Sequence, residues 1–184
     1  MPRVWTDGVV AIRRQEPADL AAHLEAVDVE QMRWLWEPGD PQRYLAMSPQ
    51  EQRAHQRRHL EHSHDTFGSG PKWAFSVDTA ADRYVAYVDC DLANDHVPLG
   101  EANISYACAP QHRGKGYTSR AVRLVCEFLR RETSAREAHI LVDPDNVASL
   151  RVARAIAAVE TETFVNERGL TMIRHVLVLN RAAP

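Results

Sequence analysis

The sequence lacks the features that mark several large classes of protein. It has three cysteines, Cys90, Cys108 and Cys126, and no C-x-x-C pair, so it predicts neither a disulfide framework nor a zinc site. We expect reduced, mostly buried thiols. No apolar run approaches the roughly 20 residues that cross a bilayer, and the first residues lack the apolar core of a signal peptide. The sequence therefore predicts a cytoplasmic protein with no membrane partner.

A surplus of positive charge is also missing. Lysine and arginine number 22 against 25 aspartates and glutamates, which gives a net charge of −3. A protein dedicated to nucleic acid needs excess positive charge to neutralise phosphates, so we expect no nucleic-acid partner. The 184 residues, 45% of them hydrophobic, suit one soluble domain over residues 1–184 with a core that needs no metal.

The hydrophobic pattern predicts a mixed sheet with helices on its faces, an α/β or layered α+β architecture. Ser48, Pro49 and Glu51 carry a helix-start signal, an N-cap followed by a capping box. The predicted strands are 9–13, 72–78, 83–91, 101–109, 138–142 and about 172–179. The predicted helices begin at about residues 20, 49, 117 and 148.

The most informative segment is the turn Gln111-His112-Arg113-Gly114-Lys115-Gly116, between a predicted strand and a predicted helix. Two glycines let several backbone N–H groups point at one spot, with the positive end of the helix dipole behind them. Arg113 and Lys115 add positive charge, so a phosphate or pyrophosphate is the expected ligand. An ordinary strand-to-helix turn is the alternative.

Two common phosphate motifs do not fit this turn. A Walker A loop requires glycine at position 109, which is Ala109, and Ser or Thr after its lysine, where Gly116 stands. The dinucleotide fingerprint requires a third glycine where Ser119 stands.

A second segment strengthens the prediction of a ligand site. The strand 138–142 ends in Asp143-Pro144-Asp145, and Asn146 and Ser149 can project from one side of the next helix start. If this strand is a parallel neighbour of 101–109, both helices begin at the same end of the sheet. A ligand would then lie across the carboxyl ends of the two strands.

From about residue 100 to 159 the sequence resembles the GNAT N-acetyltransferase superfamily, in its RimJ/RimL-like branch of ribosomal-protein and small-amine acetyltransferases. Gln111, Gly114 and Gly116 fill the family's Q/R-x-x-G-x-G/A signature, and Asn146 to Ser149 match its N-x-x-S. The resemblance implies the acyl-CoA N-acyltransferase fold, a mixed sheet of about six to seven strands flanked by helices. It places acceptor-side segments at about 1–70 and an acetyl-CoA-binding core at about 100–159.

The resemblance also implies acetyl-CoA as co-substrate, with no metal. The turn amides would bind the pyrophosphate, and the preceding strand would pair with the pantetheine arm. The matching positions are Tyr106, Ala107, Cys108, Gln111, Arg113, Gly114, Lys115, Gly116, Tyr117, Thr118, Ser119 and Asn146.

Acetyl transfer to an amine needs two proton movements, one off the amine and one onto the departing thiolate. The resemblance implies Ser149 as the acid, with a purely structural role at the helix start as the alternative; the later tyrosine that many relatives use is absent from residues 172–175. Glu101 is the candidate base, on the strand face of Asn103 and Ser105. A water relay is the alternative to it.

The expected acceptor is a primary amine: a protein N-terminus, an antibiotic or another small amine. A catalytically degenerate acyl-CoA sensor or partner module is the alternative, and an unrelated nucleotide-phosphate binder is more remote. Many relatives dimerise, so a homodimer is possible. Trp34 and Trp36 are candidates for the acceptor pocket or for the core. Four histidines have metal-like spacing but belong to a predicted solvated helix face; they are His55, His59, His62 and His64.

Overall fold

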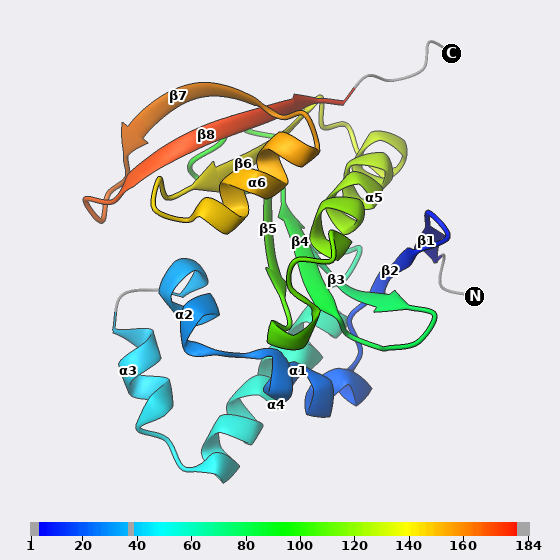
Figure 1. Cartoon of the computed structure of the whole chain (residues 1–184), viewed down its shortest axis with the longest axis vertical. Coiled ribbons are helices and arrows are strands. Elements are labelled where there is room, and N and C mark those ends of the chain that lie inside the picture. The colour runs from blue at the N-terminus through cyan, green and yellow to red at the C-terminus, as the bar shows by residue number, and fades with distance from the viewer. Residues whose placement is uncertain (1–3, 37–38, 180–184) are drawn as a thin grey trace.

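The computed structural model describes residues 4–36 and 39–179. One sheet of eight strands runs through this part of the chain in the order β1-β2-β3-β4-β5-β6-β8-β7 (Figure 1). All neighbouring strands are antiparallel except β5 and β6. The strands are β1 Trp5–Thr6, β2 Val10–Arg14, β3 Lys72–Thr79, β4 Ala86–Asp91, β5 Ala102–Cys108, β6 Glu137–Val142, β7 Val159–Val165 and β8 Thr171–Val178.

The helices confirm the predicted starts. In α4, Ser48 and Glu51 form the reciprocal capping box, and the helix begins at Pro49. The α-helices are α1 Leu20–Ala26, α2 Val29–Leu35, α3 Asp40–Leu45, α4 Pro49–Asp65, α5 Tyr117–Glu132 and α6 Val147–Ala155. Short 3₁₀ turns, η1 Pro17–Asp19 and η2 Pro110–His112, precede α1 and α5.

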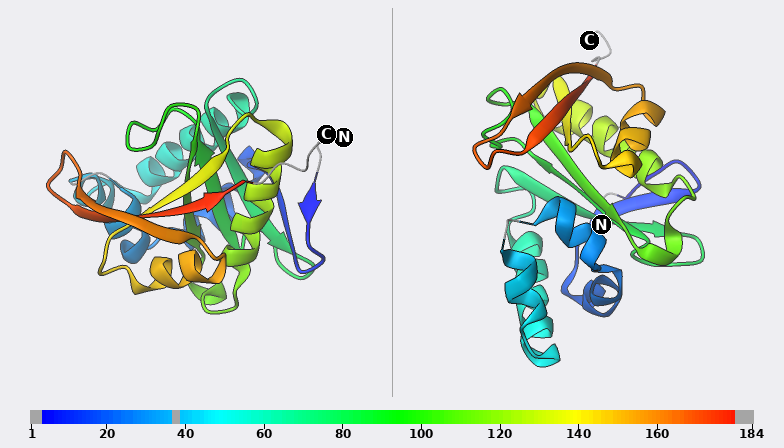
Figure 2. Two further views of the ribbon diagram at one scale, coloured as in Figure 1. Left: turned by 90° about the horizontal axis from the view of Figure 1, so that it is seen from above. Right: turned by 60° about the vertical axis from the view of Figure 1, so that its left-hand side comes forward.

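Helices cover both faces of the sheet, as β3 shows most directly. Successive side chains of a strand point to opposite faces. The ring of Phe75 packs edge-on against Phe128 of α5, with 5.0 Å between centroids. The next residue, Ser76, donates a hydrogen bond of 2.8 Å to Asp19 in η1. The α5 side of the sheet holds most of the apolar core, while the other side contacts the N-terminal helices (Figure 2).

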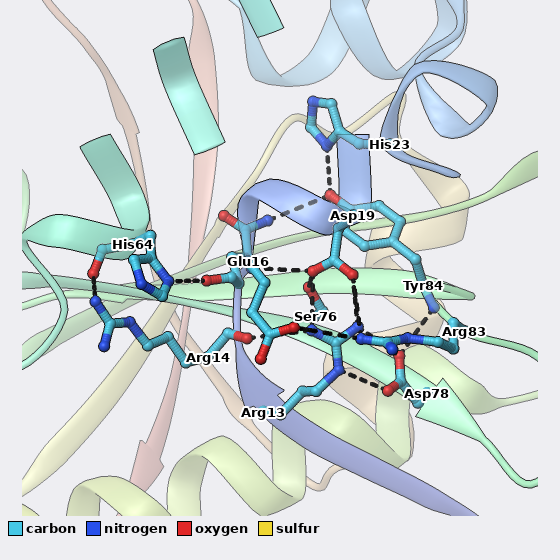
Figure 3. A network of polar contacts seen from close by, with 11 residues as sticks. Arg13, Arg14, Glu16, Asp19, His23, His64, Ser76, Asp78, Arg83 and Tyr84 are labelled. Atoms are coloured by element: carbon cyan, nitrogen blue, oxygen red, sulfur yellow. Dashed lines mark hydrogen bonds and ion pairs between the residues drawn. The ribbon is translucent and has the colours of Figure 1, made fainter. Parts of the chain in front are cut away.

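A polar network ties the N-terminal helices to that second face (Figure 3). Arg13 of β2 makes two hydrogen bonds to Asp19, of 2.7 and 2.8 Å, and two to Asp78 of β3, of 2.7 and 3.2 Å. Burial alone would raise the pKa of Asp19, but the hydrogen bonds from Arg13 and Ser76 outweigh it and hold that pKa below its usual value. Beside them, His23 of α1 lies between the Tyr84 hydroxyl and Gln56 of α4.

The parallel pair β5 and β6 separates after a short contact. Their register covers only Ala102 with Ala138 and Asn103 with His139. Beyond Asn103 the strands diverge, although both continue for several residues. Among the described residues, no strand therefore pairs with the β6-facing edge of β5 beyond Asn103.

Two parts of the sheet differ from the sequence-based expectation of six to seven strands. The short β1 and the whole of β7 were not predicted. Six of the seven residues of β7 are exposed, so its side chains show no alternating burial. It is held at the sheet edge by pairing with β8, with an irregularity between Glu160 and Glu162.

The sequence predicts no membrane span, no metal site and no disulfide framework. No helix in ranges 4–36 and 39–179 is long and apolar enough to cross a membrane. Within the same ranges, no group of three or more histidine, cysteine, aspartate or glutamate side chains is arranged to hold a metal. All three cysteines are free; Cys90 and Cys126 are buried and Cys108 is half-buried.

Candidate functional site

A cavity of about 570 Å³ opens where β5 and β6 separate. Its walls come from the second half of β5, the end of β6, the first turns of α5 and α6, and one side of α2. The hairpin between β7 and β8 closes its far end with Asn166, Arg168, Leu170 and Met172. The cavity therefore runs from the glycine turn to this hairpin, past the diverging strands.

The glycine turn forms the cavity's floor at one end. Gly114 and Gly116 have φ angles of +77° and +76°, in the left-handed region that side chains with a Cβ adopt only under strain. Gly116 is the N-cap of α5, a helix of 16 residues whose positive dipole end therefore faces the cavity. Nothing lies within 4 Å of a Cβ built on either glycine, so the requirement for glycine is conformational. This arrangement suits a phosphate or pyrophosphate.

Arg113 lies in the turn but is directed toward α2. Its Nη2 and Nη1 donate hydrogen bonds of 2.7 Å to Asp28 and 2.8 Å to Glu30. Its Nε lies 3.3 Å from the carbonyl oxygen of Cys108, which also accepts a bond of 3.2 Å from the Gln31 amide. The guanidinium is thus shared with two carboxylates, and less of its charge is left for an anion than the sequence implied.

The start of α6 forms the opposite wall. Asn146 is the N-cap, and its Oδ1 accepts the Ser149 N–H at 3.0 Å. The hydroxyl of Tyr106 on β5 donates to the Ser149 carbonyl oxygen at 3.3 Å. Burial raises the pKa of Tyr106 to about 12, although this hydrogen bond acts in the opposite direction. The phenol therefore remains protonated at neutral pH, beside the serine that the sequence singled out.

Most of the predicted site residues meet at this cavity. Those that line it are Tyr106, Ala107, Cys108, Arg113, Gly114, Gly116, Tyr117, Thr118, Ser119, Asn146 and Ser149. Gln111 and Lys115 are exposed and lie outside the lining.

Glu101 is placed differently from the prediction. Its Oε2 accepts the backbone N–H groups of Arg136 and Glu137, at 2.7 and 2.6 Å, and it does not line the cavity. Glu101 precedes β5 and bonds to the start of β6, whereas the cavity opens at the other end of these strands. Strand alternation predicts that Glu101 shares a face with Asn103, but it does not reveal how far along the strand Glu101 lies from the cavity. The position argues against Glu101 as the base.

Sequence reasoning missed two contributors. Asn103 lines the cavity, is 8% exposed, and has an Oδ1 with no hydrogen-bond partner among the described residues. Helix α2 contributes Gln31 and Arg33 to the wall, beside Trp34, which the sequence had already named as a candidate for the acceptor pocket. Its start was visible in principle, because Asp28 is a regular N-cap that accepts the Gln31 N–H.

These features define a class of protein: a mixed α/β fold whose parallel strands diverge over a glycine-turn anion site, as in enzymes that bind acyl-CoA. The chain belongs to the family described as acetyltransferase (GNAT) domain, whose pattern matches residues 10–159. It is an acetyl-CoA-dependent N-acetyltransferase. A search among curated proteins finds no match to its sequence.

Solved structures show the same fold at low sequence identity. An acetyltransferase of the GNAT family from Bacillus anthracis is 15% identical, with a TM-score of 0.75 over 96% of this chain and 99% of that one. RimL, a ribosomal L7/L12 alpha-N-protein acetyltransferase in complex with coenzyme A, is 14% identical, with a TM-score of 0.76 over 96% and 98%. RimJ from Mycobacterium smegmatis, in complex with a CoA disulfide, is 17% identical, with a TM-score of 0.71 over 96% and 85%.

Proposed function

We propose that the protein transfers an acetyl group from acetyl-CoA to a primary amine, a protein N-terminus or a small amine, by direct attack in a ternary complex. The observation that carries this proposal is that one cavity extends from the glycine turn to the end that is bordered by α2 and the β7–β8 hairpin. Donor and acceptor can then occupy it together. The amine attacks the thioester carbon directly, the C–S bond breaks, and the thiolate leaves with a proton.

The proposed position of acetyl-CoA is based on the backbone groups that border the cavity. The pyrophosphate would accept N–H groups from residues 113–117, with Thr118 and Ser119 at the helix start. The pantetheine arm would extend along the unpartnered edge of β5, beside Tyr106, Ala107 and Cys108. A backbone N–H between Ser105 and Cys108 would polarise the thioester carbonyl. The Cys108 carbonyl is already bonded to Gln31 and Arg113, so α2 helps to set the width of this channel.

The acceptor half centres on Asn103. Its buried, unpartnered Oδ1 is an acceptor that an amine N–H or a bridging water can satisfy. With Glu101 turned away, a water relay takes the proton from the amine. Ser149 is the proposed acid, and the protonated Tyr106 hydroxyl lies next to it.

The experiment that tests this function measures thiol release from acetyl-CoA with a panel of peptide and small-molecule amines. We expect amine-dependent release by the wild type. Gly114→Val should weaken CoA binding by about tenfold or more, because a β-branched residue is strained at this positive φ. The matched control is Gly100→Val, with a similar φ of +84° outside the cavity lining.

Binding of CoA without thiol release across the whole panel would contradict the proposal and favour an acyl-CoA sensor. Unchanged CoA affinity in Gly114→Val would contradict the placement of the donor.

A further inference from the structure

A buried carboxyl group, that of Asp89 on β4, lies on the same face of the sheet as the cavity residues Asn103 and Ser105. The strand register places Asp89 directly opposite Ala74 of β3 and Ser105 of β5. Residues directly opposite one another in antiparallel strands point to the same face. Since Ser105 lines the cavity, Asp89 lies just behind the cavity wall, on the side of β5 away from β6 (Figure 1).

The burial of Asp89 is only partly compensated by its contacts. The residue is 2% exposed. Its Oδ2 lies 3.4 Å from the Nζ of Lys72, and the Tyr87 hydroxyl interacts with the same carboxyl group. Its Oδ1 is buried and makes no hydrogen bond to any described residue. Such an oxygen is costly in a folded protein, so it points to a role in which a water or a proton donor reaches it.

The Ser105 hydroxyl connects this oxygen to a second one that lacks a partner. The Oγ of Ser105 accepts a hydrogen bond of 3.4 Å from the Nδ2 of Asn103, and the Oδ1 of Asn103 has no partner among the described residues. Directly opposite residues in antiparallel strands have Cβ atoms about 4.5–5.5 Å apart. A hydroxyl and a carboxylate at that spacing can interact directly or through one water. A polar path therefore leads from the cavity to Asp89.

We infer that Asp89 accepts the proton of the attacking amine, through the Ser105 hydroxyl or one water. This inference rests on the proposed function and identifies where its water relay ends. As the amine nitrogen bonds to the thioester carbon and the C–S bond breaks, the nitrogen gives its proton to the relay, and the relay gives one proton to the Asp89 carboxylate. The departing thiolate takes a separate proton from Ser149. Both residues then return to their starting states by exchanging protons with solvent. Asp89 itself does not touch the substrate.

The groups around Asp89 suit this role. Burial raises the pKa of Asp89 above its usual value, while Lys72 acts in the opposite direction and Asp91 raises the pKa further. Burial raises the pKa of Tyr87 well above its usual value, so Tyr87 stays protonated. On α4, His59 interacts with Lys72; desolvation and neighbouring positive groups lower its pKa to about 4, so it is neutral near pH 7. On this face, the described residues of β5 carry no titratable side chain.

The test measures thiol release from acetyl-CoA with benzylamine and with a tetrapeptide as the amines. Asp89→Asn keeps the size of the side chain but removes the proton acceptor, so we expect kcat to fall by about a hundredfold or more while CoA affinity stays unchanged. The matched control is Asp91→Asn, two residues along the same strand and face. Asp91 lies opposite Asn103, and its Oδ1 accepts the Ala93 N–H. This variant should keep the kcat of the wild type.

Lys72→Gln gives a readout that a purely structural role of Asp89 would not change, and it does not require Asp89→Asn to fold. The Lys72 side chain is 54% exposed, and its charge lowers the pKa of Asp89. Removing that charge raises the pKa of Asp89. Because only the ionised carboxylate accepts a proton, the acidic limb of the kcat profile should move to higher pH, with the plateau near the wild-type kcat. The amine is the same in both profiles, so its own ionisation cannot cause the difference.

Three results would each overturn the inference and leave the proposed function standing. They are an Asp89→Asn variant that binds CoA and keeps its kcat, an equal loss of kcat in Asp91→Asn, and an acidic limb that does not move in Lys72→Gln. If Asp89→Asn does not fold, the limb in Lys72→Gln decides. Absence of thiol release by the wild type with every amine would contradict the proposed function, and the inference would fall with it.

Discussion

Arg113 and Asp28, separated by 85 positions in the sequence, form an ion pair of 2.7 Å across the cavity wall. One partner belongs to the turn that is proposed to hold the donor pyrophosphate, and the other is the N-cap of α2, which borders the acceptor end. The pair therefore joins the two halves of the site. An arriving pyrophosphate would compete with Asp28 for the same guanidinium.

Asp28→Asn tests this link. Its Oδ1 can still cap α2, but the charge that holds Arg113 is lost. We expect CoA affinity to rise by about two- to fivefold as Arg113 turns toward the phosphates, and the KM of the acceptor to rise as α2 loosens. Calorimetry and steady-state kinetics measure the two effects. The control is Asp7→Asn, since Asp7 likewise accepts backbone N–H groups with Oδ1 and an arginine, Arg120, with Oδ2. Identical behaviour of the two variants would refute the link.

The roles of Ser149 and Tyr106 can be distinguished by removing the hydroxyl group of each residue in turn. If Ser149 protonates the thiolate, Ser149→Ala lowers kcat by about a hundredfold or more while CoA affinity stays unchanged. Tyr106→Phe removes only the hydrogen bond to the Ser149 carbonyl and should have a smaller effect. Single-turnover kinetics and CoA binding distinguish these effects. A larger loss in Tyr106→Phe would identify the tyrosine as the acid instead.

Glu101 should act on stability rather than on turnover. Glu101→Ala leaves two backbone N–H groups at the start of β6 without their acceptor, which costs about 1–3 kcal/mol. Glu101→Gln keeps an acceptor oxygen, so both its stability and its kcat should stay near the wild-type values. Urea unfolding and kcat measure this. A kcat reduced by about a hundredfold in Glu101→Gln would restore Glu101 as the base.

Acidification should weaken the fold through His23. Burial lowers the pKa of His23 below 6.5, and its Nε2 lies 2.8 Å from the Gln56 side-chain oxygen. The unfolded chain binds the proton more readily than the folded protein, so the contribution of His23 to stability is fully present above pH 6.5. It is lost as the pH falls from 6.5 through the lowered folded value. Chemical denaturation across this range should show that the free energy of unfolding depends less steeply on pH in His23→Gln than in the wild type. Equal slopes in the two proteins would contradict the assignment of this pH dependence to His23.

Local signals in the sequence predicted much of the fold. The Ser48 capping box, the apolar face of α5 and the turn at Gly114 and Gly116 each depend on residues a few positions apart. The structure has α4, α5 and the left-handed turn where those signals placed them. The missed strand β7 shows the limit of such signals. Its side chains are almost all exposed, so it is a strand because of pairing with β8 rather than because of its own pattern.

The sequence by itself determined most of the elements, the order in which those elements occur, and the succession of a glycine turn and an N-x-x-S helix start. These are local properties, because backbone conformation, capping and amphipathicity are set within a few residues. Only the tertiary structure decided where β5 and β6 separate, which way Arg113 turns, that Glu101 bonds to the start of β6, and that α2 and the β7–β8 hairpin enclose the acceptor end. Each of these depends on residues far apart in the chain, whose distance is set by how the whole sheet and its helices pack.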